Sequence, residues 1–359
     1  MSKNKNKEKS SIQDNIALLN LMVKDAKKLE GIYQPGPYWV KKTKSAVNEI
    51  KNFGLTHFRG FKNGAAHSYS DVVITDVRHV TNYGIRGFLS KVYRNLYPLN
   101  RLFDGQVNIT TAYFKEALKY KTIILKKLDR VNYLLAKYSL NFETTKGGCE
   151  SFADFEGVNI SFYYLNLLDT LDYINQKTSI ENKKSFFEIG GGFGANTHLI
   201  VELFNIKKII YLDIAPNLYV GTQYLKSFYG KKVIDYSLTK DMKNIEFSDN
   251  DELEVFCIQP NQIEKIKSKI DWFHNENSFV EMPKKIIKNY AQKIEDILSN
   301  DNPTISLVSY DGFGLHTKNK EDYTNTSDPE ILPSFFTKPA SRNLYPTIAG
   351  RTCVHFIIE

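Results

Sequence analysis

The sequence predicts an α/β protein, in which a mostly parallel β-sheet covered by helices on both faces follows a helical N-terminal half. Three observations predict this class. Apolar residues recur at helical spacing over much of residues 12–174, short apolar runs alternate with helical stretches from residue 185 onward, and a glycine-rich turn follows the first run. The 359 residues are 42% hydrophobic and 25% charged, which is ordinary globular composition and excludes a disordered chain.

The first half is expected to be mainly helical. Two early helices are expected to end at Gly31 and Gly54, since glycine readily adopts the left-handed conformation that terminates a helix. Residues 55–83 have no clear periodicity and are expected to be irregular. The expected helices span residues 12–29, 43–53, 85–96, 110–138 and 158–174.

Short apolar runs after residue 185 are expected to be the strands of the sheet. They span residues 185–189, 208–212, 253–258, 271–274, 304–309 and 352–358. Helical stretches between them provide the crossovers that parallel strands require. No obvious crossover helix precedes the last run, so we expect it to pair antiparallel at the edge of the sheet.

Charge is distributed unevenly along the chain, whose formal net charge is +8. Residues 1–150 contain 26 Lys and Arg against 12 Asp and Glu, whereas residues 151–359 contain 22 against 28. A basic half could contact nucleic acid, an anionic membrane face or a phosphorylated substrate, but solvated helix surfaces also account for it. Because no zinc finger, Arg-rich run or aromatic RNA-binding motif occurs, a nucleic-acid partner is not expected.

Cysteine usage and hydropathy bear on the compartment. Cys149, Cys257 and Cys353 form no close pair and have no metal-ligand spacing, which favours a reducing environment. No apolar run approaches the roughly 20 residues that span a bilayer, and the basic start lacks a secretory apolar core. We therefore expect a cytoplasmic protein without a membrane span; the sequence does not predict its oligomeric state.

The strongest chemical signal is the run FFEIGGGFG at residues 186–194, which joins a strand to a helix. Gly190, Gly192 and Gly194 lack a Cβ, so backbone amides in this turn can approach a ligand closely. Nineteen residues after Gly194, the second strand ends in Asp213. A carboxylate there can accept hydrogen bonds from both ribose hydroxyls of an adenosine.

A dinucleotide and an adenosyl amino acid can both use this geometry. Residues 190–195 also satisfy the G-x-G-x-x-G/A pattern of NAD or FAD sites, and a turn without a ligand is a further alternative. Glu188, two residues before the first glycine, would repel a pyrophosphate but could hold a cationic amino-acid group. The chain after residue 185 also provides one sheet and no separate catalytic domain, which disfavours a dehydrogenase.

Three runs carry a family resemblance: EIGGGFG at 188–194, DIAPNLY at 213–219 and NENSFVEM at 275–282. Together they resemble class I S-adenosylmethionine-dependent methyltransferases, and more narrowly the bacterial sugar O-methyltransferases. The resemblance covers roughly residues 147–359. It implies a Rossmann-like seven-stranded sheet of order 3-2-1-4-5-7-6, with an antiparallel last strand and S-adenosylmethionine over strands 1, 2 and 4.

The resemblance also implies a set of cofactor contacts. Asp213 would hold the ribose, and Gln259 would flank the adenine, although the family usually has an acidic residue at that place. The residues that would line the methionine side are Glu188, Gly190, Gly192 and Gly194. On this basis the chain divides into a disordered basic tail at 1–12, a helical cap that binds the acceptor at 13–180, and an S-adenosylmethionine-binding methyltransferase domain at 181–359.

A methyl acceptor that reacts through a hydroxyl needs a base, which we expect beyond the carboxyl ends of the fourth and fifth strands. Glu276 is a candidate base or hydroxyl anchor, Asn275 could orient donor or acceptor, and His316 could act as a base from a glycine-containing loop. No ligand spacing calls for a metal, although Glu276 and Asp311 could hold one. Glu281 could instead cap the following helix.

Other residues have more ordinary interpretations. His274 is either a core residue or a site residue, whereas His198 and His355 are expected to be structural. Arg59 could contact the phosphate of a nucleotide-sugar but is expected to be solvated at the surface. The segments 58–61 and 147–150 are candidate lid elements over the acceptor.

The sequence therefore favours an S-adenosylmethionine-dependent O-methyltransferase that acts on a sugar, nucleotide-sugar or glycan precursor, as in surface polysaccharide synthesis. Two alternatives stay open. The acceptor could be a non-sugar small molecule or a macromolecule. The chain could also be a non-catalytic scaffold that retains a cofactor-like pocket for a partner.

Overall fold

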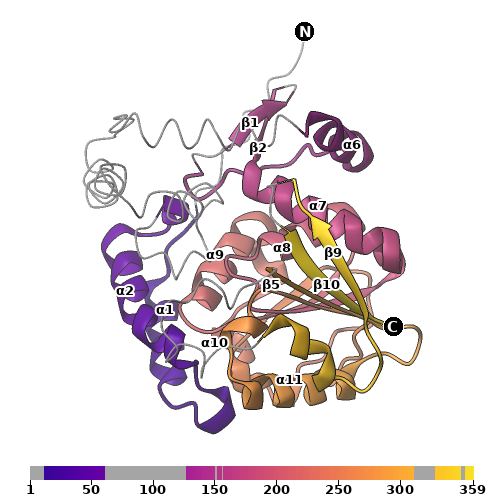
Figure 1. Ribbon diagram of the computed structural model, residues 1–359. Coiled ribbons are helices and arrows are strands. Elements are labelled where there is room, and N and C mark those ends of the chain that lie inside the picture. The colour runs from indigo at the N-terminus through magenta and orange to yellow at the C-terminus, as the bar shows by residue number, and fades with distance from the viewer. Residues whose placement is uncertain (1–11, 61–126, 150–151, 156, 311–327, 349–351) are drawn as a thin grey trace, which may run out of the picture.

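An eight-stranded sheet forms the centre of the molecule (Figure 1). Its strands lie in the order β5-β6-β4-β3-β7-β8-β10-β9. Neighbouring strands from β5 to β8 pair in parallel, whereas β10 is antiparallel to both β8 and β9. In chain order the strands are β3 (Ser185–Ile189), β4 (Lys208–Leu212), β5 (Val233–Ile234), β6 (Glu254–Ile258), β7 (Trp272–Glu276), β8 (Thr304–Tyr310), β9 (Ser341–Pro346) and β10 (Thr352–Ile358).

This topology confirms the predicted fold class. Without the two-residue strand β5, the order of the other seven strands is 3-2-1-4-5-7-6, the order implied by the resemblance to class I methyltransferases. The chain winds from β3 outward through β4 to β6 and then resumes at β7 on the other side of β3. Ligands of open α/β sheets bind at the carboxyl ends of the strands beside such a switch point.

Two sequence-based expectations were wrong in this sheet. The last strand, β10, is antiparallel as predicted but does not lie at the edge, because β9 pairs along its other side. We missed β9 because Ser341–Pro346 is an exposed edge strand whose alternating burial leaves little apolar signal. The start of the expected helix at 158–174 is instead β2 (Val158–Ser161), which forms a hairpin with β1 (Phe152–Phe155).

Helices cover both faces of the sheet. In Figure 1, α7 (Phe162–Thr178), α8 (Ala195–Phe204) and α9 (Asn217–Tyr229) lie on one face, and α11 (Lys284–Ile297) lies on the other. The apolar side chains of the first three helices form one buried cluster with the sheet, and those of α11 form a second. The remaining helices include α1 (Ile16–Ala26), α2 (Pro37–Phe53), α6 (Leu128–Tyr138) and α10 (Tyr236–Thr239).

Local sequence explains these elements. All five residues of β3 are buried, so this central strand is apolar on both faces apart from Glu188 and Ser185. In α11, Ile286, Ile287, Tyr290, Ala291 and Ile294 recur at helical spacing and face the sheet.

The N-terminal helices pack against the central sheet. Residues of α1 and α2, including Met22 and Trp39, belong to the same buried cluster as residues of α7 and β3. A separate ionic contact fastens α6 to α7, because Arg130 donates to both Asp169 and Asp172 at 2.8 Å. The division of the chain near residue 180 therefore stays a prediction, and the described parts on its two sides share a core.

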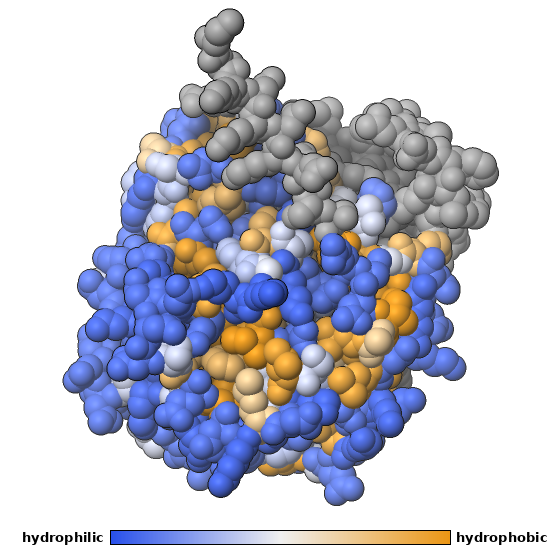
Figure 2. All heavy atoms as spheres, turned by 180° about the vertical axis from the view of Figure 1, so that it is seen from behind, coloured by the Kyte–Doolittle hydropathy of each residue, from blue (hydrophilic) through white to orange (hydrophobic). Residues whose placement is uncertain are grey.

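The structure describes residues 12–60, 127–149, 152–155, 157–310, 328–348 and 352–359. The predicted helix at 85–96 and the candidate base His316 lie outside these residues. Among the described helices, none is both long and apolar enough to cross a membrane. Seen from behind, hydrophobic residues gather in the middle of the face, and hydrophilic ones surround them (Figure 2).

Candidate functional site

The glycine turn between β3 and α8 has the backbone conformation that its sequence predicts. Gly190, Gly192 and Gly194 all have positive φ, at 76°, 63° and 85°. Gly190 N donates to Leu212 O at 2.8 Å, which ties the turn to the end of β4. A Cβ on Gly190 would lie 2.3 Å from the Cβ of Ser278, so the residue after β7 closes over this turn. Only glycine fits here, for both conformation and space.

Asp213 lies where β4 ends and is buried against the turn. Its Oδ2 accepts from Gly192 N at 3.0 Å, and its Oδ1 accepts from Ile214 N at 2.7 Å. Burial raises the pKa of the Asp213 carboxyl to about 8, although both amide hydrogen bonds oppose this shift. Each carboxylate oxygen can accept a further hydrogen bond, so the group can bind a vicinal diol such as that of a ribose.

Glu188 lies within β3, just before the turn, and is 1% exposed. Its two carboxyl oxygens accept from Asn196 Nδ2 at 3.1 Å and Thr197 Oγ1 at 3.0 Å, and both donors lie in the first turn of α8. Burial raises the pKa of Glu188, and the neighbouring Glu276 adds to this effect. A cation beside Glu188 would relieve this cost by favouring its ionised form.

Gln259 directly follows β6 and is also buried. Its Nε2 donates to Met22 O at 2.8 Å, which ties helix α1 to the end of this strand. Its Oε1 finds no hydrogen-bond partner among the described residues. A buried carbonyl oxygen without a partner is costly, and the exocyclic amine of an adenine is a donor of the right kind.

The amide group of Asn275 is hydrogen-bonded to the backbone and to the Ser278 hydroxyl. Its Nδ2 donates to Ile189 O at 2.9 Å, and its Oδ1 accepts from Phe279 N at 3.1 Å. Ser278 Oγ also donates to Ile189 O, at 3.0 Å. These contacts join the ends of β3 and β7 and set the turn after β7. Asn275 thus shapes the site, and its amide group is directed at protein atoms rather than outward.

Glu276 ends β7 and is more accessible than Glu188, the other carboxylate beside the glycine turn. Its Oε2 accepts from Asn196 Nδ2 at 3.4 Å and lies 3.8 Å from His274 Nε2. Asn196 therefore bridges Glu188 and Glu276 and places both carboxylates on the same side of the glycine turn. The side chain of Glu276 is 13% exposed, so it can exchange a proton with a bound molecule or solvent.

Helix α2 reaches the same edge through Trp39. Its indole Nε1 donates to Glu281 Oε2 at 3.0 Å. Burial raises the pKa of the Glu281 carboxyl to about 7, opposed by Lys42 and Trp39, and the charge of Glu281 in turn raises the pKa of Asp213. The prediction that Glu281 caps α11 was wrong, since that helix has Pro283 as N-cap and no side-chain cap.

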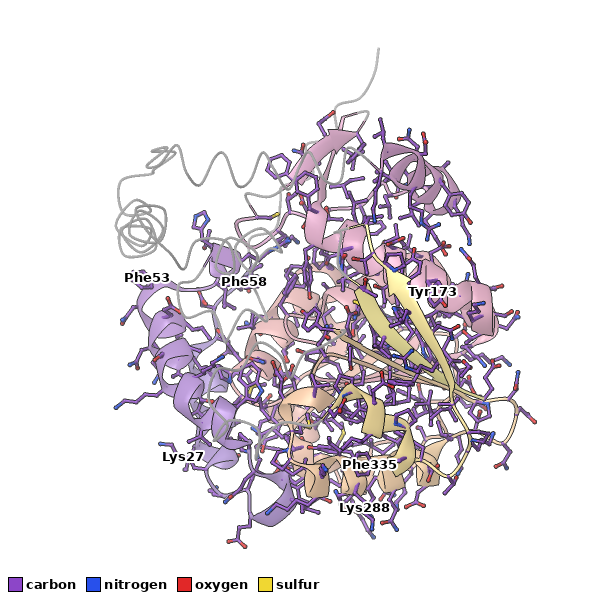
Figure 3. The ribbon with its side chains drawn as sticks, viewed as in Figure 1. Lys27, Phe53, Phe58, Tyr173, Lys288 and Phe335 are labelled. Atoms are coloured by element: carbon purple, nitrogen blue, oxygen red, sulfur yellow. The ribbon has the colours of Figure 1, made fainter. Side chains whose placement is uncertain are left out.

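The two predicted lid elements contact each other. A Cβ on Gly147 would lie 2.2 Å from the ring of Phe58, which is labelled in Figure 3. The Phe58 ring packs edge-on against that of Phe193 in the glycine turn, with 5.4 Å between the ring centroids. Arg59 is not a solvated surface residue, as we expected, but is 1% exposed. The Arg59 guanidinium donates to Thr144 O and Ser161 Oγ, both at 2.6 Å. These hydrogen bonds replace those that the group would make to water at the surface.

His198 and His355 are buried. His198 Nδ1 lies 2.8 Å from Tyr164 Oη, and its ring stacks on Phe228, which fits the predicted packing role. His355 packs edge-on against Tyr173, a residue of α7 that lies beside β9 and β10 (Figure 3). Within the same residues, no group of three or more His, Cys, Asp or Glu is arranged to hold a metal ion.

The structure thus brings most of the predicted residues together at one edge of the sheet: Glu188, Gly190, Gly192, Gly194, Asp213, Gln259, Asn275 and Glu276. Sequence reasoning missed Trp39, Met22 and Ser278, which reach this edge through long-range contacts. Only Ser278 carried a local signal, since it lies within the 275–282 run.

No protein-family model matches the sequence, and no curated protein matches it. Solved structures match at low similarity. The methyltransferase domain of bacterial CtHen1 is 13% identical with a TM-score of 0.35, and the match covers 54% of this chain and 99% of that one. The N-methyltransferase NodS from Bradyrhizobium japonicum, in complex with S-adenosyl-L-homocysteine, is 11% identical with a TM-score of 0.36. That match covers 54% of this chain and 86% of NodS. An O-methyltransferase from Bacillus cereus is 8% identical with a TM-score of 0.33, and the match covers 64% of this chain and 89% of that one. No functional assignment follows from scores this low.

Proposed function

We propose that this chain is an S-adenosylmethionine-dependent methyltransferase. The observation that carries the proposal is the glycine turn at 190–194, with three positive φ angles, and its hydrogen bond from Gly192 N to Asp213. This arrangement provides a diol acceptor beside a turn that only glycine can form. Gln259 Oε1, without a partner among the described residues, adds an acceptor for adenine at the end of the next strand.

Charge distinguishes this donor from a dinucleotide. Glu188, Asp213 and Glu276 surround the turn, and the hydrogen bonds to them come from Asn196, Thr197 and backbone amides, which are neutral. A sulfonium and an α-ammonium group are attracted to carboxylates, whereas the pyrophosphate of NAD is repelled by them. The site therefore fits a cationic adenosyl donor better than an anionic dinucleotide.

For the acceptor we propose a hydroxyl group of a sugar, nucleotide-sugar or glycan precursor. The support is chemical: a hydroxyl must lose its proton on transfer, and Glu276 provides a partly exposed carboxylate at the end of β7. The sugar class itself rests on the sequence resemblance. Tyr163, whose ring lies 5.5 Å from that of Phe193, and Tyr310 at the end of β8 provide aromatic surface next to this edge.

The proposed reaction is an in-line displacement. The acceptor oxygen attacks the methyl carbon, the bond from that carbon to sulfur breaks with its electron pair going to sulfur, and the products are a methyl ether and S-adenosylhomocysteine. The acceptor proton passes to Glu276 and then to solvent. Alignment of acceptor and donor provides much of the rate enhancement, and a positioned base adds about 10²–10⁴-fold.

Thermal unfolding with S-adenosylmethionine, S-adenosylhomocysteine and NAD in parallel tests the donor assignment. At about 100 times its dissociation constant, a true ligand stabilises the folded chain by about 2.7 kcal/mol. We expect stabilisation by the two adenosyl compounds, and loss of it in Asp213→Ala. As a matched control, Asp235→Ala removes another mostly buried carboxylate that lies away from the turn and contacts Lys226 and Ser237. Stabilisation by NAD alone overturns the proposal.

Transfer of a labelled methyl group to a panel of nucleotide-sugars and glycan fragments tests the acceptor. We expect Glu276→Gln to lower kcat by about 10²–10⁴-fold while the dissociation constant of the donor changes less than about threefold. Transfer to amines but not to hydroxyls would overturn the acceptor part of the proposal. Donor binding without transfer to any acceptor would favour the scaffold alternative.

A further inference from the structure

A chain of buried polar groups runs behind Glu276 on the face of the sheet covered by α7. His274 pairs in register with Ser306 on the neighbouring strand, and His274 Nδ1 lies 2.8 Å from Ser306 Oγ. Trp272 Nε1 donates to the same hydroxyl at 2.8 Å. Both Trp272 and His274 are fully buried. The chain Trp272, Ser306, His274 thus leads along β7 toward Glu276.

Hydrogen-bond accounting assigns the direction of this chain. An indole N–H can only donate, so Ser306 Oγ accepts from Trp272. The single proton of Ser306 can go to His274 Nδ1 at 2.8 Å or to Phe273 O at 3.4 Å, and the shorter distance favours the imidazole. In a neutral ring whose Nδ1 accepts, Nε2 carries the proton. The imidazole N–H then faces Glu276.

His274 Nε2 has no hydrogen-bond partner among the described residues and lies 3.8 Å from Glu276 Oε2. This distance is too long for a hydrogen bond, but catalytic contacts are often long before substrate binds and tighten in the complex. Asn196 Nδ2 already contacts the same oxygen at 3.4 Å from the other side. A small shift of Glu276 toward the strand would place Oε2 between two donors.

Other titratable groups face this region from the neighbouring elements. Glu188 on β3 contacts Asn196, His355 lies on β10, and Tyr310 ends β8. Burial lowers the pKa of His355 to about 4 and raises that of Tyr310 well above its usual value, so both are neutral near pH 7. Tyr163 and Tyr173 face the region from α7, and Cys353 lies beside Tyr310 in the sheet.

We propose that His274 is a positioning residue, whose Nε2–H holds the carboxylate of Glu276 in the orientation that accepts the proton of the methyl acceptor. The proposal rests on the proposed function, because it gives Glu276 a partner in that reaction. His274 itself touches neither donor nor acceptor. Ser306 and Trp272 fix the tautomer and the ring, as the partners of a catalytic imidazole or carboxylate commonly do.

Two substitutions separate this role from simple packing. His274→Phe keeps an aromatic ring beside Trp272 and Phe186 but removes both nitrogens. Ser306→Ala keeps the backbone and removes the hydroxyl that fixes the tautomer, and Ser306→Thr restores a hydroxyl. The matched control is His355→Phe, which changes an equally buried histidine on the same face of the sheet.

We expect His274→Phe to lower kcat by about 10–100-fold, with the dissociation constant of the donor changed less than about threefold. Ser306→Ala should also lower kcat, by a smaller factor, and Ser306→Thr should restore most of the lost kcat. The kcat of the control His355→Phe should stay within about threefold of the wild-type value. The acid limb of the profile of kcat/KM against pH should move to higher pH in His274→Phe, because the carboxylate loses a donor.

A double-mutant cycle with Glu276→Gln completes the test. If His274 acts through Glu276, His274→Phe has little further effect in the Glu276→Gln background. An equal loss in both backgrounds, or unchanged kcat and pH profile in His274→Phe, overturns the proposal. Should His274→Phe fail to fold, the two Ser306 variants give the same decision. A wild-type chain that transfers no methyl group fails the proposed function instead, so the two failures are distinguishable.

Discussion

The two faces of the sheet around β7 and β10 differ in character. Toward α11, Phe273 on β7 and Val354, Phe356 and Ile358 on β10 belong to an apolar cluster. Toward α7, the intervening residues include His274 and Glu276 on β7 and His355 on β10. Figure 1 shows these two helices on opposite sides of the same strands. One face is built for packing, and the other carries buried polar groups.

The polar face is the one where buried groups lower the stability of the fold. On the α7 face, His274 Nε2, both ring nitrogens of His355 and Asn196 Oδ1 find no hydrogen-bond partner among the described residues. Each such atom costs about 1–3 kcal/mol relative to a partnered one. Two of these groups, on His274 and Asn196, lie beside Glu276 at the candidate site, where a polar group that costs stability can serve a function.

Loss of a large side chain from the apolar face should have the largest effect on stability. Phe273 is fully buried and packs edge-on against Phe187 at 5.3 Å. Phe273→Ala should lower the free energy of unfolding by about 3–5 kcal/mol, because it removes apolar surface and leaves a cavity. His355→Leu on the other face should cost less than about 1 kcal/mol or stabilise the chain. Denaturant unfolding of both variants checks this, and equal losses would contradict the comparison.

A second test concerns the turn at the edge where both faces end. Gly190→Ala combines a left-handed φ of 76° with a Cβ 2.3 Å from Ser278, so the turn must deform. We expect donor affinity to fall by at least about 100-fold, since misplacement by about 1 Å can have effects of this size. Isothermal titration with S-adenosylmethionine measures it.

Gly230→Ala is the matched control for that change. Gly230 also has a positive φ, 56°, but an added Cβ would meet nothing within 4 Å. Both variants strain a backbone with positive φ, and only Gly190→Ala also places its Cβ against a neighbouring side chain. Equal donor affinity in the two variants would show that the turn does not contact the donor.

His355, on the polar face, should make the stability of the chain depend on pH. Burial lowers the pKa of His355 from its ordinary 6.5 to about 4, so the unfolded chain binds a proton between these values that the folded chain does not. The free energy of unfolding is therefore unaffected by His355 above pH 6.5 and decreases as the pH falls from 6.5 toward 4. His355→Leu should therefore unfold less readily than wild type in acid, and the gain should reach about 1–3 kcal/mol near pH 4. Thermal unfolding from pH 4 to 7 measures it, and a gain independent of pH would contradict it.

The pH dependence of donor affinity should be the smallest of these effects. The pKa of Asp213 is raised by burial to about 8, so its carboxylate must lose a proton before it can accept from a ribose diol or attract a cation. Donor affinity should rise with pH from 6 to 8 by about tenfold, and Asp213→Asn should flatten this dependence. Glu281, with a pKa of about 7, adds to the same trend. Affinity that falls over this range in titrations would contradict the assignment of Asp213.

The sequence predicted where the glycines and the carboxylates of the candidate site lie better than it predicted the residues that cover them. Glu188, the glycines and Asp213 follow from local patterns, because each lies at a fixed place relative to a strand end. The contacts of Met22 with Gln259 and of Trp39 with Glu281 join residues more than 230 positions apart, and no local pattern encodes them. Asn275 was predicted to orient a ligand, but its amide bonds to the backbone, a choice that only the packing of two strand ends determines.

A crystal structure with bound S-adenosylhomocysteine would show whether the glycine turn and Asp213 hold the adenosyl donor. We expect the ribose hydroxyls within hydrogen-bond distance of Asp213, the adenine amine at Gln259 Oε1, and the sulfur on the side of the turn where Glu276 lies. The ligand bound elsewhere, or a turn that rejects it at saturating concentration, would contradict the account.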